Sequence, residues 1–291
     1  MLIITSILNK WVYNMRKYRL RRFIKPDSTI TLFLLFCFIT QAFSSSKASE
    51  NYLKLKIDRC QAALAANPND AKYVIELAQA YLYNNNNSEA ITTFNKALSL
   101  KLNDQQKSKA YIGLSQAYVN AKNWDAAIAT LKSGLKSLNG DFDLYSKLGE
   151  LYMCQGQPKQ ATAQFKKAVA LNPNDCQIHV FLGMALSLDN KNGEAINEEK
   201  LALKLNPKNC DADYYLAMAY LANNNVDQAQ QACNDALLNN PKYADAYKLL
   251  ACIYASKNDK TQALANINQA IKLKPENVSY QKVLAKINKM P

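Results

Sequence analysis

The feature that most constrains this chain is an internal repeat. A leucine recurs at intervals of 34 residues, with one interval of 37. The six leucines are Leu77, Leu114, Leu148, Leu182, Leu216 and Leu250. Alanine follows each leucine after 13 residues, and a small residue comes seven positions later. A fixed period of this length is typical of stacked repeat units, so we expect an array of similar units.

The pattern inside each period predicts two helices joined by a turn. The small residues allow a neighbouring helix to approach, and the leucines, with a tyrosine four positions later in five units, fill the space between helices. Proline closes most units, where it ends the second helix. These prolines are Pro173, Pro207, Pro241 and Pro275. Asn residues clustered at 84–87, 190–192 and 223–225 favour turns with left-handed backbone.

This spacing resembles the tetratricopeptide repeat. The unit 142–175 carries most of that pattern, in Tyr145, Leu148, Gly149, Tyr152, Gly156, Ala161, Phe165, Ala168 and Pro173. The resemblance implies an all-α fold, a right-handed superhelical solenoid of helix-turn-helix units. It covers six units: 71–104, 108–141, 142–175, 176–209, 210–243 and 244–277, with 105–107 as an insertion. Glu199 and Cys233 stand where an aromatic residue is usual, which affects local packing.

Segments outside the repeats complete the predicted organisation. Residues 45–70 indicate a leading helix, and residues 278–291 indicate a C-terminal capping helix. Such ends are needed because a helix pair at the end of a stack has one uncovered apolar face.

Residues 1–44 have the order of a secretory signal, with either Met1 or Met15 as the start. A basic stretch precedes an apolar run at 30–40, and small and polar residues follow. The run is short for a membrane span, which needs about 20 residues. We therefore expect a cleaved signal and an exported protein, periplasmic or secreted. The alternative is a protein anchored in a membrane through residues 29–43.

The formal net charge of +13 raises the question of polyanion binding. Seven of the positive charges lie before residue 30, and the other lysines are scattered along the predicted helices. Scattered charge favours a solvated surface over a phosphate-binding face, so we expect no nucleic-acid partner.

The sequence offers little for catalysis. The one histidine, His179, takes a packing position, and no CxxC, phosphate loop or nucleophile elbow is present. We therefore expect no enzyme activity, no metal and no cofactor. The six cysteines after residue 50 do not have the spacing of a disulfide framework, and we expect most of them to be buried apolar residues.

The resemblance implies a protein or peptide partner in a concave groove lined by the first helix of each unit. By register, the predicted contact residues are Val180, Phe181, Met184, Tyr214, Tyr215, Met218, Leu221 and Lys248. Some of these side chains could instead pack against a neighbouring helix. The first three units are more polar at these positions, and the Lys/Asn/Arg set that clamps a terminal carboxylate in some family members is not found. The alternative functions are a structural subunit or assembly factor of a cell-envelope or secretion complex and, less favoured, a polyanion binder.

Overall fold

The computed structural model describes residues 51–138 and 140–290. The signal or anchor predicted within residues 1–44 lies outside this range. Arg59–Pro291 form one compact unit, and residues 51–66 are helical. In the described ranges every regular element is a helix, which confirms the predicted all-α solenoid. None of these helices is both long enough and apolar enough to cross a membrane.

Thirteen further helices follow in six pairs and a final single helix. The first helices of the pairs are α3 (Ala71–Tyr83), α5 (Asp104–Asn120), α7 (Phe142–Cys154), α9 (Cys176–Leu188), α11 (Cys210–Ala222) and α13 (Ala244–Ser256). The second helices are α4 (Asn87–Leu98), α6 (Trp124–Ser137), α8 (Pro158–Leu171), α10 (Asn192–Leu205), α12 (Val226–Asn239) and α14 (Lys260–Leu273). The last helix is α15 (Val278–Asn288).

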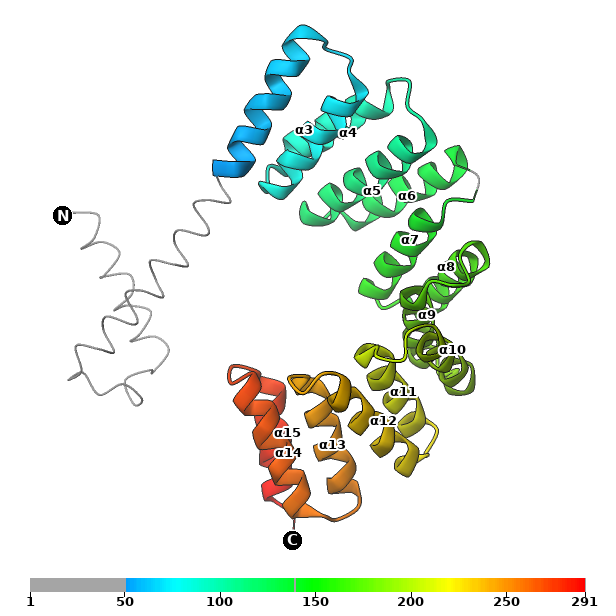
Figure 1. Cartoon of the computed structure of the whole chain (residues 1–291), viewed down its shortest axis with the longest axis vertical. Coiled ribbons are helices and arrows are strands. Elements are labelled where there is room, and N and C mark those ends of the chain that lie inside the picture. The colour runs from blue at the N-terminus through cyan, green and yellow to red at the C-terminus, as the bar shows by residue number, and fades with distance from the viewer. Residues whose placement is uncertain (1–50, 139, 291) are drawn as a thin grey trace, which may run out of the picture. The chain divides into compact units, whose positions relative to one another are not determined.

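The pairs stack in chain order, each packing against the next (Figure 1). Helix α3 contacts α5, α5 contacts α7, α7 contacts α9, and α9 contacts α11. Among the described residues, no two second helices contact each other to a similar extent. The first helices are therefore closer together than the second helices, and the surface formed by α3, α5, α7, α9, α11 and α13 is here called the inner face.

One position of each second helix fills the space beside the first helix. Its occupants are Phe94, Leu131, Phe165, Glu199, Cys233 and Ile267, and all six are fully buried. In the third unit the ring of Phe165 lies over Gly149, where an added Cβ would come within 2.5 Å of the ring. The recurring large and small residues therefore interlock, as their spacing predicts.

Glu199 is the exception in this set. Its carboxyl group is buried beside Gly183, and neither oxygen has a hydrogen-bond partner among the described residues. Burial, with smaller contributions from Glu198 and Asp211, raises the pKa of Glu199 to about 10. The side chain is therefore neutral at pH 7, because a charged carboxylate without a partner is strongly disfavoured in an apolar interior.

The turns within the units share one backbone conformation. The fifteenth residue of every unit has a positive φ, between 59° and 65°. These residues are Asn85, Lys122, Gly156, Asn190, Asn224 and Asn258. The left-handed backbone expected in the Asn-rich turns is thus confirmed at Asn85, Asn190 and Asn224.

The predicted insertion at 105–107 lies inside a helix. Asn103 caps α5 in a capping box with Gln106, so α5 begins at Asp104 and has 17 residues. The other five first helices have 13 residues each. The extra residues therefore extend α5 by about one turn.

Helix α15 covers the end of the stack. Tyr280 and Ile287 are buried against the apolar side of α14, and the Tyr280 hydroxyl donates a hydrogen bond of 2.9 Å to Asp245. The ammonium group of Lys260 donates to the carbonyl groups of Asn288 and Met290. This positive charge satisfies carbonyl groups that have no partner within the helix.

Candidate partner-binding face

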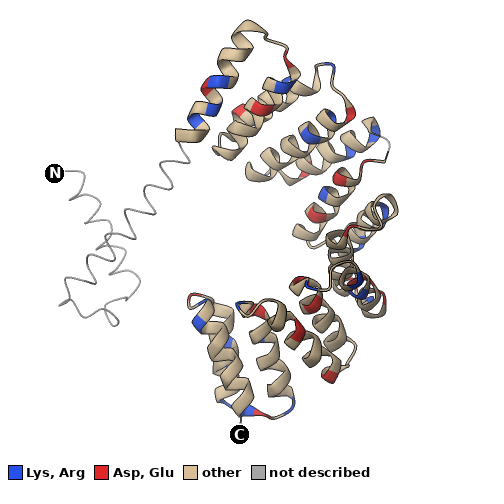
Figure 2. Cartoon of the chain, in the orientation of Figure 1, with Lys and Arg blue, Asp and Glu red and all other residues tan. Residues whose placement is uncertain are grey.

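The inner face does not carry the positive charge of the whole chain. Its six helices contain five lysines, seven Asp or Glu residues and no Arg. Figure 2 shows that the charged residues are dispersed over the helices of both kinds. The inner face therefore lacks the basic stripe that phosphate recognition requires.

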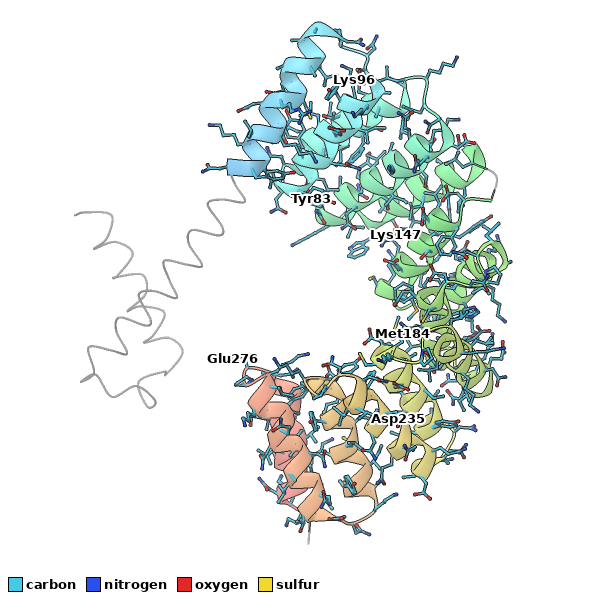
Figure 3. All side chains as sticks on the ribbon, viewed as in Figure 1. Tyr83, Lys96, Lys147, Met184, Asp235 and Glu276 are labelled. Atoms are coloured by element: carbon cyan, nitrogen blue, oxygen red, sulfur yellow. The ribbon has the colours of Figure 1, made fainter. Side chains whose placement is uncertain are left out.

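Three of the predicted contact residues, on α9, α11 and α13, are accessible and are not among those packed in the core or aromatic clusters. Met218 is 38% exposed, and Met184 and Lys248 are partly exposed. Leu188, one turn beyond Met184 on α9, is 58% exposed. Figure 3 shows Met184 on the same inner side of the stack as Lys147 of α7. These side chains form an accessible apolar strip, defined by Met184, Leu188 and Met218, with Lys248 on α13.

Val180 does not belong to this strip, and its prediction as a contact residue needs correction. Its side chain is fully buried and packs with Ala202 of α10 and Ala212 of α11. The family register placed Val180 on the inner face. In the structure, Val180 lies where α9, α10 and α11 meet, so its side chain is buried between these helices.

Phe181 and Leu221 have mixed roles. Both are partly buried and pack against the main core cluster. The ring centroid of Phe181 lies 5.8 Å from that of Phe165. Aromatic pairs at this separation stabilise one another, so part of the Phe181 side chain serves the fold.

Tyr214 and Tyr215 belong to an aromatic cluster. The Tyr214 ring lies 5.3 Å from Tyr215 and 5.1 Å from Tyr243, the residue before α13. The Tyr243 hydroxyl donates a 2.8 Å hydrogen bond to Asp211. Burial, followed by the charge of Asp245, raises the pKa of Tyr214 above its usual value. Tyr214 and Tyr243 thus bridge α11 and the start of α13, and Tyr215 keeps a partly exposed edge.

His179 packs as expected. It is buried, its Nδ1 lies 2.7 Å from Glu198, and its Nε2 lies 2.9 Å from the carbonyl oxygen of Pro173. Both ring nitrogens are therefore occupied by structural contacts. Within the described ranges, no group of three or more His, Cys, Asp and Glu side chains is arranged to hold a metal ion.

The expectation that most cysteines are buried is wrong. Cys60 and Cys233 are buried, Cys154 and Cys252 are exposed, and Cys176 and Cys210 are intermediate. Cys154 and Cys252 lie on the inner helices α7 and α13. Their exposure shows that a cysteine in a helix of this repeat need not be part of the core.

A cavity between α5 and α7 was not predicted from the sequence. It lies in the first three units, whose inner-face positions are more polar. It is lined by Ile112 and Val119 of α5, Trp124 of α6 and Leu151 of α7. The signal that could have found it is the seven-residue spacing of Ile112 and Val119 on one side of α5, with Trp124 just beyond.

Family models for the tetratricopeptide repeat match residues 58–107, 75–141, 142–175, 188–251 and 244–277. The chain belongs to the tetratricopeptide repeat family. Two of these matches, 142–175 and 244–277, have the same limits as units of the predicted repeat. A comparison with curated proteins finds no match.

Solved tetratricopeptide repeat proteins share this fold. YrrB, described as a TPR protein with an unusual peptide-binding site, is 26% identical, with a TM-score of 0.54 over 68% of this chain and 97% of that one. MamA is 25% identical, with a TM-score of 0.51 over 57% of this chain and 98% of that one. The C-terminal part of a repeat protein from Cytophaga hutchinsonii is 18% identical, with a TM-score of 0.61 over 84% and 98% of the two chains.

Proposed function

We propose that this chain is a non-enzymatic scaffold that binds a peptide segment of a protein partner along its inner face. The observation that carries the proposal is the strip on α9 and α11, in which Leu188 and Met218 are exposed and Met184 is partly exposed. Methionine side chains are flexible and polarisable, and they suit surfaces that bind apolar side chains of a partner. The similarity of this chain to YrrB, which is described as having a peptide-binding site, also supports the proposal.

The test is capture of partners by the tagged full chain, identified by mass spectrometry. The variant Met184→Gln, Leu188→Gln, Met218→Gln removes apolar surface while keeping residues of good helix propensity. We expect this variant to lose a specific partner by at least tenfold in recovered amount, with unchanged helical circular dichroism.

A matched control changes three leucines on the second helices. Leu201, Leu205 and Leu238 are exposed on α10 and α12, away from the inner face. We expect Leu201→Gln, Leu205→Gln, Leu238→Gln to retain the partner. Full recovery of the partner by the inner-face variant would contradict the proposal.

The second candidate is a structural subunit or assembly factor of an envelope or secretion complex. The exposed leucines on the second helices favour it, since they could bury apolar area against another subunit. In that case the second-helix variant, rather than the inner-face variant, loses its partner. Polyanion binding is disfavoured by the balance of charge on the inner face, and it would weaken steeply with added salt.

Export is a separate proposal that rests on residues 1–44. The basic stretch, short apolar run and small residues support cleavage after Ala42 or Ser44. N-terminal sequencing of the protein from its own cells would test it. An intact N-terminus in the membrane fraction would favour an anchor through residues 29–43 instead.

A further inference from the structure

The cavity between α5 and α7 is a partly open feature of the inner face, with apolar and polar side chains in its lining. It has a volume of about 190 Å³. Ile112, Val119, Trp124 and Leu151 supply apolar lining, and Cys154 and Gln116 are exposed residues of the lining. Both helices belong to the inner face, so the cavity lies on the surface that the proposed function assigns to a peptide.

The charged residues of the cavity lining neutralise each other. The Lys147 ammonium nitrogen lies 2.7 Å from a Glu150 oxygen, one turn along the same helix. Gln116 is held by a 3.0 Å hydrogen bond to Asn120. The lining therefore offers no net charge to a ligand, and an occupant that carries a charge would be desolvated without compensation.

The volume restricts what the cavity can hold. An apolar cavity of about 150 Å³ can take up benzene, whereas sites for drug-sized ligands and cofactors span about 300–1,000 Å³. A cavity of about 190 Å³ therefore fits one large side chain and is too small for a cofactor.

We propose that this cavity binds a single uncharged leucine- or phenylalanine-sized side chain of the peptide that lies along the inner face. The proposal rests on the proposed function, and it adds an anchoring point about two units from the strip of Met184, Leu188 and Met218. The partner segment would then carry two apolar anchors, one for α5 and α7 and one for α9 and α11.

The experiment uses the fluorescence of Trp124 in the full chain. The chain has two tryptophans, so Trp11→Phe leaves Trp124 as the only one. The probes are N-acetyl-leucinamide and N-acetyl-phenylalaninamide, with N-acetyl-aspartamide and N-acetyl-lysinamide as charged counterparts. We expect a saturable change of the Trp124 emission with the apolar amides in the millimolar range, and a response at least tenfold weaker with the charged amides.

Two variants with the same added ring separate the cavity from the rest of the inner face. In Cys154→Phe the ring occupies the cavity, and we expect the response to be lost. In Cys252→Phe the ring is added on α13, and we expect the response to remain. Both cysteines are exposed, so circular dichroism should be unchanged for both.

The proposal is overturned by an absent response, by an equal response to charged amides, or by a response that survives Cys154→Phe. These outcomes differ from failure of the proposed function, which is read from partner capture by the Met184→Gln, Leu188→Gln, Met218→Gln variant. A selective Trp124 response with unchanged partner capture would support the cavity and reject the strip.

Discussion

At the scale of single residues, Glu199 shows how one side chain can alter stability without altering the fold. Four of the five equivalent positions hold Phe, Leu or Ile, and one holds Cys. The helix pair still forms, with Gly183 beside the Glu199 side chain as Gly149 lies beside Phe165 in the third unit. The effect is on stability: folding removes water from the Glu199 carboxyl group, and no hydrogen bond within the described residues replaces it.

Glu199→Leu is expected to stabilise the protein at neutral pH. The folded pKa of about 10 lies above the ordinary value of 4.5. Between these values the unfolded chain loses a proton that the folded chain keeps, so the free energy of unfolding falls by about 1.4 kcal/mol per pH unit. Between pH 5.5 and 7.5 the free energy of unfolding of the native chain should therefore fall by about 2–3 kcal/mol because of this group. Below pH 4.5 the carboxyl group is protonated in both states, and this pH dependence disappears.

Urea denaturation of the two chains at several pH values measures the difference. We expect Glu199→Leu to be more stable by about 2–4 kcal/mol at pH 7.5, with a smaller gain at pH 5.5. Glu194→Gln, at a half-exposed position on the same helix, is the control and should keep the native pH dependence. A gain independent of pH would show that Glu199 has a partner in the folded protein.

Gly149→Ala is expected to destabilise the third unit. The added Cβ would meet the buried Phe165 ring at 2.5 Å, and overpacking of this kind costs about 1–3 kcal/mol. Gly193→Ala is the matched control, because no atom lies within 4 Å of its added Cβ and alanine favours the helix. Thermal unfolding followed at 222 nm should shift in opposite directions. A common shift would contradict the packing argument.

At the scale of elements, the turn residues predict a second pair of opposite effects. Lys122 has a φ of 61°, a conformation that costs a residue with a Cβ roughly 1 kcal/mol. Lys122→Gly should therefore raise the free energy of unfolding by about 0.5–1 kcal/mol. Gly156→Lys, at the equivalent turn, should lower it by a similar amount, and chemical denaturation of both variants measures the sign. Equal signs would show that side-chain contacts, rather than backbone conformation, decide these turns.

The helices could largely be predicted from the sequence, because each unit repeats the same spacing of large and small residues. The inner-face residues were harder, since the register says which side of a helix a residue lies on but not how far a neighbour covers it. Val180 is buried because α10 and α11 both reach it, and Tyr214 packs on Tyr243 across a unit boundary. The cavity at Trp124 is lined by three helices, so the spacing of Ile112 and Val119 marks one wall of it, and the other walls follow only from how α6 and α7 pack.

At the scale of the whole stack, α15 is predicted to hold the last units together. Tyr280→Ala removes a fully buried ring and its hydrogen bond to Asp245, and we expect a loss of about 3–5 kcal/mol. Hydrogen exchange should increase most in α13, α14 and α15 and least in α3 and α4, because the repeats contact mainly their neighbours.

Val278→Ala on the same helix is the control for Tyr280→Ala. Val278 is exposed, so this variant should stay within about 0.5 kcal/mol of the native chain. Uniform loss of protection from α3 to α15 in Tyr280→Ala would contradict the expected gradient and indicate one cooperative unit.

The contacts between neighbouring pairs have a mechanical consequence. Because each pair is held mainly by the pair before and after it, tension applied at the two ends loads every unit in series. The weakest unit then yields first, and each released unit of 34 residues adds roughly 110 Å of extended chain. The stack would therefore lengthen in steps of one unit, and the buried carboxyl group of Glu199 would lower the resistance of the fourth unit at neutral pH.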